Sequence, residues 1–379
     1  MGGASAGRGS PPAAGAAPRR RGMKRPSFFE HLHPPSVPEL QARIRYTLGL
    51  GGLSLFFFLV VSLSGALLLF YYSPSAEQAN ATVQLLQYHV SLGWLVRGLH
   101  FWSAQALLLT TGLHLLRVAL TGGFRAGRRF NWLLGLGMLV LVFALDFTGY
   151  GLRWDRSIGW ALLVGTNLLE QVPLIGQMLH RWAVGGPQLG QATVLRFFGW
   201  HVFGLMLPAS ALLVWHLFRV RRDGGIAHEP GARVAQPDAA IERAPASSGE
   251  GGLPARLPRS ELVRREVLAM LFAMAALLAI VALAPPALDG PLDLAALSDQ
   301  ARAPWFFLWV QELLRLGDPL WMGVMLPLAA LALLALLPYA IDRGRRLGRW
   351  LPPDGRLAQA LTIVLAVAIG ALTLRGALR

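Results

Sequence analysis

Four histidines lie within apolar stretches of this 379-residue chain, where an imidazole is a candidate ligand for a metal ion or a metal-containing cofactor. His100 and His114 share one stretch, and His201 and His216 share another. An imidazole in an apolar environment is costly unless it finds a partner, and a single one would more often be a hydrogen-bonded core residue. Four of them in two pairs favour a common chemical role.

The spacing places the members of each pair on roughly one face of a helix. His100 and His114 are 14 residues apart, about 40° short of a whole number of turns, and His201 and His216 are 15 apart, about 60° past one. If the two helices run in the same direction, His100 lies level with His201, and His114 level with His216. Two bis-histidine sites at two depths are what two stacked haems require. No acidic residue stands beside the histidines to favour a zinc or di-iron site.

Four glycines repeat the histidine spacing. Gly51 and Gly65 share one apolar stretch, Gly135 and Gly149 share another, and each pair has the same separation as His100 and His114. Glycine allows a flat macrocycle or another backbone to approach closely, although small residues are also common wherever membrane helices pack. The repeat predicts that these four glycines pack against the haems.

The elements that must position these residues are membrane-spanning helices. Apolar residues make up 54% of the chain and charged residues 15%, against roughly 25% charged in soluble domains. Backbone groups must be hydrogen-bonded internally in lipid, so apolar spans are expected to be helical. We predict an all-α integral membrane protein, with a four-helix di-haem bundle followed by three further transmembrane helices. The seven expected spans are 47–72, 91–120, 131–152, 197–220, 264–284, 318–340 and 357–375.

The net charge of +15 follows the expected membrane topology, which argues against nucleic acid as a partner. Of the 35 Lys and Arg residues, 26 lie in segments that share one side, eight lie on the other, and Arg97 lies within a span. The positive-inside rule then places the N-terminus in the cytoplasm. We expect a multi-pass protein of a bacterial inner (plasma) membrane, surrounded by lipid. The basic segments are 1–46, 117–131, 219–265 and 342–356.

Composition also divides the chain along its length. Residues 1–40 are predicted to form a disordered basic arm, and residues 223–260, rich in Pro, Ala and Gly, a flexible cytoplasmic linker. Between and after them we expect a four-span domain at 41–222 and a three-span domain at 261–379. The chain has no cysteine, which excludes disulfides, thiolate metal sites, iron–sulfur ligation and thioether-attached haem on this chain.

The first four spans resemble cytochrome b of the quinol:cytochrome c reductases, and most of all cytochrome b6 of the b6f type. Residues 261–375 are similar to the three-span subunit IV of that complex, so the two parts are fused here. The spacing of the fourth-span histidines is also b6-like. The matching stretches are Gly93-Trp94-Leu95-Val96-Arg97-Gly98-Leu99-His100, Leu120-Thr121-Gly122-Gly123-Phe124, Phe147-Thr148-Gly149-Tyr150, and Gly190-Gln191-Ala192-Thr193 with Arg196-Phe197-Phe198 and His201.

The resemblance implies a redox subunit that is catalytic only within a complex. Quinol would be oxidised near the external face, with one electron going to a Rieske iron–sulfur protein and on to a c-type cytochrome. The other electron would pass through two non-covalent b haems to a quinone near the cytoplasmic face. The family further implies a homodimer of the complex. The outer haem would be held by His100 and His201, and the inner haem by His114 and His216.

Two arginines are expected near the outer haem. Arg97 precedes His100 by one helical turn, and Arg196 precedes His201 by five residues. Both are placed to pair with the haem propionates. The alternative is that their side chains extend to the membrane interface.

The chain departs from the family at the quinol-oxidation motif. Ala303-Pro304-Trp305-Phe306 stands where the family has Pro-Glu-Trp-Tyr. Pro304 and Trp305 are kept as the quinol-site loop, but the acid expected to accept a proton is missing. We expect Glu312 to replace it, with Asp146 of the third span second. The plain alternatives are an exposed Glu312 paired with Arg315 and an Asp146 that only accepts structural hydrogen bonds.

Two further departures concern cofactors. Gly49 stands where b6f-type relatives attach a third haem through a cysteine, which excludes covalent attachment but leaves a non-covalent third haem open. Arg153, in Gly151-Leu152-Arg153-Trp154-Asp155, replaces the family's proline, and nothing in the sequence explains it. The altered quinol motif favours a low-potential quinol such as menaquinol.

Two other functions fit parts of the pattern. A di-haem membrane anchor of a quinone-linked dehydrogenase or hydrogenase would share the bis-histidine sites, but not the last three spans or the Trp305 loop. A haem-free transporter or channel would predict polar residues clustered at mid-membrane and often an internal repeat. We find no such repeat in the sequence.

Overall fold

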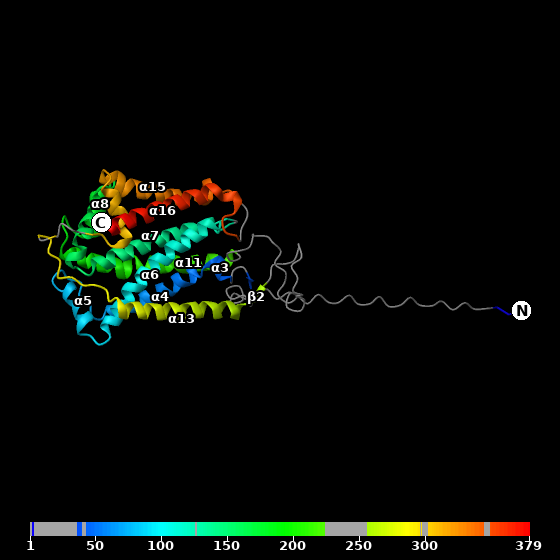
Figure 1. The fold of residues 1–379 in the computed structure, drawn as a ribbon, viewed down its shortest axis with the longest axis horizontal. Helices are drawn as coiled ribbons and strands as arrows, with labels where there is room; N and C mark the ends of the chain where they lie inside the picture. The colour runs from blue at the N-terminus through cyan, green and yellow to red at the C-terminus, as the bar shows by residue number, and fades with distance from the viewer. Residues whose placement is uncertain are drawn as a thin grey trace.

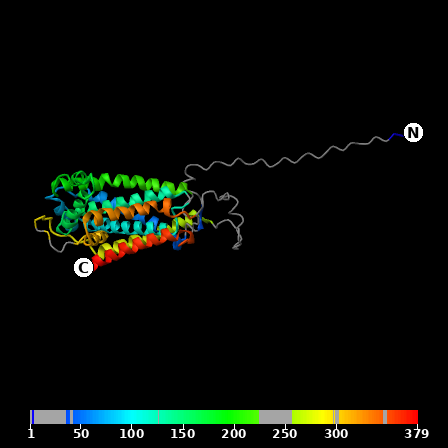
Figure 2. The ribbon, with the colours of Figure 1, turned by 90° about the horizontal axis from the view of Figure 1, so that it is seen from above.

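Seven long helices run side by side along the long axis of the computed structural model (Figures 1 and 2). The structure describes residues 2–3, 36–39, 43–125, 127–223, 256–295, 297, 302–344 and 349–379. Within these residues each of the seven helices is long and apolar enough to cross a membrane, which confirms the predicted all-helical membrane fold. The spans are α4 (Leu50–Leu68), α6 (Gly93–Leu120), α7 (Arg129–Gly151), Gln191–Arg222, α13 (Arg259–Leu283), Leu320–Ile341 and Pro353–Leu378.

Three of the spans are built from consecutive pieces. The fourth combines α10 (Gln191–Gly199), the π-helical η2 (Trp200–Gly204) and α11 (Met206–Arg222). The sixth combines η4 (Leu320–Met325), α15 (Leu326–Leu336) and η5 (Leu337–Ile341). The seventh begins with η6 (Pro353–Gly355) and continues as α16 (Arg356–Leu378).

Short elements cover the two ends of the bundle (Figure 1). One end, here called the α8 end, carries α5 (Ala79–Tyr88), η1 (Arg156–Ile158), α8 (Gly159–Glu170), α9 (Gly176–Val184), η3 (Trp305–Phe307) and α14 (Leu308–Leu314). The opposite, α3 end carries α3 (Ile44–Thr47), β1 (Ser36–Pro38) and β2 (Arg256–Pro258). The antiparallel pair β1–β2 is an exception to the all-α prediction. The predicted basic arm and linker lie largely outside the described residues.

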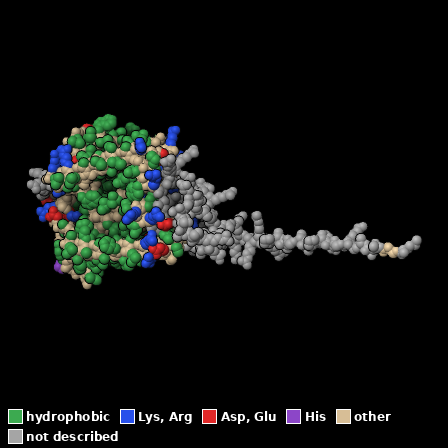
Figure 3. Space-filling view, turned by 45° about the vertical axis from the view of Figure 1, so that its right-hand side comes forward, with side chains coloured by type: hydrophobic (Ala, Val, Ile, Leu, Met, Phe, Trp, Pro, Cys, Tyr) green, Lys and Arg blue, Asp and Glu red, His purple; other side chains and the backbone are tan. Residues whose placement is uncertain are grey.

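The outer surface of the bundle is apolar. Large apolar side chains such as Phe272 and Val214 are 77% and 69% exposed, which suits a lipid environment and would be unfavourable in water. Apolar side chains cover the middle of the visible face, and charged ones gather toward its two ends (Figure 3). This division matches the membrane spans predicted from hydropathy.

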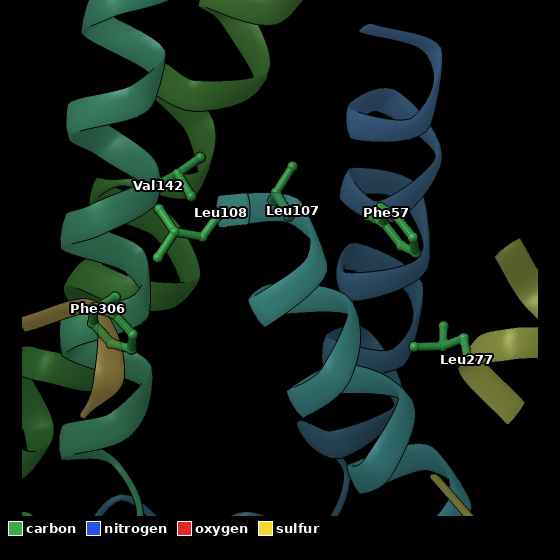
Figure 4. Packing of buried hydrophobic residues seen from close by; sticks show 6 residues of the cluster. All are labelled: Phe57, Leu107, Leu108, Val142, Leu277 and Phe306. Carbon is green, nitrogen blue, oxygen red and sulfur yellow. The ribbon is translucent and has the colours of Figure 1, made fainter. Parts of the chain in front are cut away.

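The last three spans pack around the first four rather than beside them as a separate bundle. Helix α13 contacts α4 and α6, whereas α15 contacts α7, and α16 contacts α6. The central core accordingly draws side chains from both parts of the chain. Its buried members are Phe57, Leu107, Leu108, Val142, Leu277 and Phe306 (Figure 4).

A buried ion cluster joins the two parts at the α3 end. Arg125, between α6 and α7, lies 2.9 Å from a carboxylate oxygen of Asp342 and 2.9 Å from one of Asp354. The Arg125 and Asp342 side chains are both almost fully buried. Removing one partner of such a pair leaves an uncompensated buried charge.

We therefore expect Arg125→Met to destabilise the protein by about 3–5 kcal/mol, seen as a lower midpoint of thermal denaturation in detergent. Arg43→Met is the matched control, because Arg43 pairs with Glu39 at the exposed surface and such pairs are worth about 0–1 kcal/mol. Equal midpoints for the two variants would contradict a stabilising role for the buried cluster.

Candidate functional site

The four histidines meet as two pairs at two depths of the bundle. The ring centres of His100 and His201 lie 6.1 Å apart, with 73° between the ring planes. His114 and His216 are close enough for their charges to interact. Each pair joins α6 to the fourth span, so the structure brings together the partners expected from the spacing.

A π-helical turn adjusts the register of the fourth span. His201 lies in η2, where the backbone takes more residues per turn than an α-helix. The additional residue between His201 and His216 is thereby absorbed, and their longer separation acts like the shorter one between His100 and His114. With one residue absorbed, the expected offset becomes about 40° short of four turns, the same as between His100 and His114.

Backbone carbonyl groups fix the orientation of the His100 and His201 rings. His100 Nδ1 lies 2.9 Å from the Val61 carbonyl oxygen, and His201 Nδ1 lies 3.1 Å from the Leu145 carbonyl oxygen. A carbonyl oxygen only accepts hydrogen bonds, so each Nδ1 must carry the proton. Each Nε2 then keeps a free lone pair, which is the form that binds a metal ion.

Two hydroxyl groups near these rings were not anticipated from the sequence. Ser64 Oγ lies 3.4 Å from His100 Nδ1, and Thr148 Oγ1 lies 3.1 Å from His201 Nδ1. Both residues immediately precede a predicted haem-packing glycine, Gly65 or Gly149. A hydroxyl residue before the glycine was therefore the available signal.

Each predicted glycine lies against one imidazole. A Cβ atom added to Gly65 would lie 2.8 Å from His100 Cε1, and one added to Gly149 would lie 2.8 Å from His201 Cε1. The same test gives 3.1 Å between Gly51 and His114, and 3.6 Å between Gly135 and His216. The glycines of α4 and α7 thus make room for the histidines of α6 and the fourth span.

The separation of the His100 and His201 rings suits one metal ion between them. Two imidazole nitrogens that each bind a metal at about 2 Å place their ring centres roughly 6 Å apart. The observed 6.1 Å agrees with this requirement. A cavity of about 370 Å³ adjoins the pair, walled by α4, α6, α7 and η2.

Arg97 contributes a buried positive charge to this cavity. Its guanidinium donates hydrogen bonds to Gln87 Oε1 at 2.6 Å and to the carbonyl oxygens of Pro286 and Ala287 at 3.0 and 3.2 Å. None of these acceptors is charged, although the side chain is only 7% exposed. A buried cation without an anionic hydrogen-bond partner is unfavourable, and Asp155 offsets its charge only through space, next to the like charge of Arg153. The carboxylates of a bound cofactor would compensate it.

The other expected arginine, Arg196, does not line this cavity. Its guanidinium donates to the Trp182 carbonyl oxygen at 2.5 Å and borders a separate hollow with Trp182 and Trp200. Arg153 lines the cavity instead. It lies 5.4 Å from the centre of the Tyr150 ring and pairs with Asp155. The structure thus locates the residue that the sequence left unexplained, and the pairing of Arg196 with a haem propionate stays a prediction.

The two candidate acids occupy different surroundings. Asp146 lines the cavity, is 7% exposed, and its Oδ2 atom has no hydrogen-bond partner. Glu312 does not line the cavity, and its oxygens lie 2.9 Å from Arg315, 3.1 Å from Arg375 and 3.6 Å from Arg379. The pairing with Arg315 matches the sequence-based alternative. The exposure assumed for Glu312 is wrong, because α16 covers it and leaves it 2% exposed.

The Trp305 loop reaches the same region. Trp305 Nε1 donates to Gln105 Oε1 at 2.7 Å, and Gln105 lines the cavity. Phe306 packs against Tyr150 with 5.3 Å between ring centres. Pro304 precedes η3, the short 3-10 helix that holds both aromatic residues.

Several buried polar atoms near the His114/His216 pair lack partners. His114 Nδ1 has none, and the His216 imidazole has only a weak hydrogen bond with the Asn131 backbone. Tyr46 Oη and one terminal nitrogen of Arg117 are also without hydrogen bonds. Buried polar groups usually have hydrogen-bond partners. The region around His114 and His216 is therefore also suited to bind a cofactor with polar groups or a metal ion.

Comparisons with known proteins agree with this geometry. The family Cytochrome b/b6/petB matches residues 37–224. The chain is 38% identical over 174 residues to cytochrome b6 of Auxenochlorella protothecoides, covering 46% of this chain and 81% of that protein. It is 37% identical over 175 residues to cytochrome b6 of Prochlorococcus marinus (strain MIT 9215), covering 46% and 80%. A solved structure described as a hyperthermophilic respiratory Complex III has a similar fold, with a TM-score of 0.75 and 22% identity over 91% of this chain and 86% of that one.

Proposed function

This chain belongs to the cytochrome b/b6 family, and from that premise we propose that it is the haem-b subunit of a quinol:cytochrome c reductase. The observation that carries the proposal is the pair of bis-imidazole sites, one above the other between α6 and the fourth span. The family binds haem b. Haems held by histidine pairs at two depths would provide a path for electrons across the membrane.

In this proposal His100 and His201 hold the outer of two non-covalent b haems, and His114 and His216 hold the inner one. Bound haem supplies one-electron redox chemistry. The protein's own residues would orient it: the Val61 and Leu145 carbonyls hold the proton on Nδ1 of His100 and His201 and leave their Nε2 atoms free to bind the iron. The four glycines leave space for the imidazoles, and Arg97 would offset the charge of the propionates. Arg153 lines the same cavity and is a second candidate for that role.

We place the α8 end on the external side of a bacterial inner membrane and the N-terminus in the cytoplasm. The distribution of Lys and Arg supports this orientation. Quinol is then oxidised near the Trp305 loop, and quinone is reduced near the α3 end. The altered loop motif favours menaquinol as the quinol.

The complex supplies what this chain lacks. Its sequence has no cysteine to hold an iron–sulfur cluster. In this proposal a Rieske iron–sulfur protein therefore receives one electron and passes it to a c-type cytochrome. We propose that the complex is a homodimer. This part of the proposal rests on the resemblance of the sequence to the reductase family.

We further propose that residues 261–379 act as a fused, subunit IV-like part joined through the 223–260 linker. Its residues Leu277 and Phe306 enter the central core, and Trp305 bonds to Gln105 of α6. This integration of the last three spans favours the reductase over a di-haem anchor that would lack them.

Haem content and a stepwise redox titration of the purified protein test the proposal. We expect two b-type haems per chain that titrate at separable potentials. One haem, or none, would break the pairing of His100 with His201 and of His114 with His216, and a haem-free transporter would again have to be considered.

A further inference from the structure

Oxidation of a quinol releases two protons as well as two electrons, so a base is needed beside the bound quinol. The motif Ala303-Pro304-Trp305-Phe306 in the Trp305 loop of this chain contains no acidic residue. The following inference rests on the proposed function and concerns the residue that takes the proton.

Asp146 lies between the face of α7 that contacts the Trp305 loop and the face that contacts His201. On one face Phe143 and Tyr150 contact Phe306, at 6.4 and 5.3 Å between ring centres. On the other face Gly149 lies against His201. Successive residues of a helix are about 100° apart, which places Asp146 about 60° from Phe143 on one side and about 60° from Gly149 on the other. Its carboxyl group therefore lies between the Trp305 loop and the histidine pair.

Asp146 makes no ion pair with the residues that the structure describes, whereas Glu312 is paired with arginines. No hydrogen bond holds Asp146 Oδ2, and the residue lies at the wall of the histidine cavity, on the helix that contacts Phe306 of the Trp305 loop. A carboxylate with three arginines around it, as at Glu312, would have to give up those ion pairs on accepting a proton.

The other ionisable groups at the wall of the histidine cavity do not serve as the acceptor. Arg97 and Arg153 are cations, and His100 and His201 are used as ligands. Burial raises the pKa of Tyr72 above its usual range, and the Tyr72 hydroxyl donates to the Leu152 carbonyl oxygen, so it stays neutral. Tyr150 is likewise a neutral phenol at physiological pH.

We propose that Asp146 is the proton acceptor for quinol oxidation, in place of the acid missing from the Trp305 loop. One quinol O–H bond breaks and its proton forms an O–H bond on the Asp146 carboxylate. One electron reduces the ferric outer haem, and the other reduces a one-electron iron–sulfur acceptor on a partner protein. The second proton leaves to water at the α8 end, which completes the conversion of quinol to quinone.

The test compares Asp146→Asn with Asp146→Glu and Glu312→Gln in the purified complex. Menadiol serves as the quinol, and stopped-flow absorbance follows reduction of haem b. Asp146→Asn should slow this reaction by about a hundredfold, whereas reduction by dithionite, which requires no proton acceptor, should be unchanged. Asp146→Glu should restore most of the rate. A normal rate in Asp146→Asn, or a slow Glu312→Gln beside a normal Asp146→Asn, would overturn the assignment.

Redox-difference infrared spectroscopy gives a second readout. When menadiol reduces the wild-type complex, a carboxylic acid band should appear, shift in Asp146→Glu and vanish in Asp146→Asn. If Asp146→Asn fails to assemble, the wild type and Asp146→Glu still decide: a missing or unshifted band overturns the proposal. Failure of the proposed function itself would look different, because the wild type would then lack two haems or would not be reduced by menadiol.

Discussion

The double substitution of His100 and His201 with leucine is expected to leave one haem per chain, whereas substitution of His100 and His216 is expected to leave none. His100 and His201 belong to one site, so replacing both removes no more than one haem. His100 and His216 belong to different sites, so replacing both removes a ligand from each. Leucine fills a similar volume without a nitrogen donor, and each haem depends on two imidazoles.

Haem per protein in detergent, together with the number of steps in a redox titration, measures this outcome. Each single variant should retain one haem. Two substitutions in the same pair should therefore cost no more haem than one, whereas substitutions in different pairs should add. One haem in the His100/His216 variant, or none in the His100/His201 variant, would show that the histidines are paired differently.

The seven spans and the pairing of histidines could be predicted because both follow from simple geometry. The thickness of the hydrocarbon layer sets the span length, and a single intervening span makes α6 and the fourth span run in the same direction. The pairing of His100 with His201 can then be predicted without knowing the structure of the loops. The number of transmembrane helices and the level of each histidine are thus contained in the pattern of apolar residues.

The local adjustments could not be predicted, because they depend on contacts across the bundle. The π-helical turn at His201 inserts a residue that no periodicity reveals. Arg196 is drawn toward the Trp182 carbonyl oxygen by the position of α9. Glu312 is buried by α16, which begins only after the whole sixth span has intervened in the chain. The direction of a long side chain is decided by such tertiary partners.

The same limit applies to the acid that serves the quinol site. From sequence, Glu312 is the closer replacement because it follows the Trp305 loop within a few residues. Its three arginine contacts only become visible once α14 and α16 are packed together. Asp146 is far from Trp305 in the chain, on the other side of the 223–260 linker, yet it lies on the helix that the loop contacts. Proximity in sequence favours Glu312, whereas the packing of the loop on α7 favours Asp146, as we propose.

Gly149→Ala is expected to weaken or abolish binding of the outer haem, whereas Gly135→Ala should leave the inner haem intact. A Cβ atom at residue 149 would lie 2.8 Å from His201 Cε1, well inside the optimal carbon–carbon separation of about 3.5–4.0 Å. The imidazole would have to move, and its hydrogen bond to the Leu145 carbonyl oxygen would break or bend. At residue 135 the corresponding distance to His216 is 3.6 Å, which is ordinary contact.

The two substitutions form a matched pair, since both place alanine in α7 and both gain helix propensity of about 1 kcal/mol. Any difference in haem retention or in haem potential therefore reports on the imidazole beside each glycine and not on the helix. If Gly135→Ala lost its haem as completely as Gly149→Ala, the glycines would be needed to admit the macrocycle rather than to seat the histidine. Equal retention in both variants would mean that the His201 ring can shift without losing the iron, and the tight contact at Gly149 would then have no role in ligation.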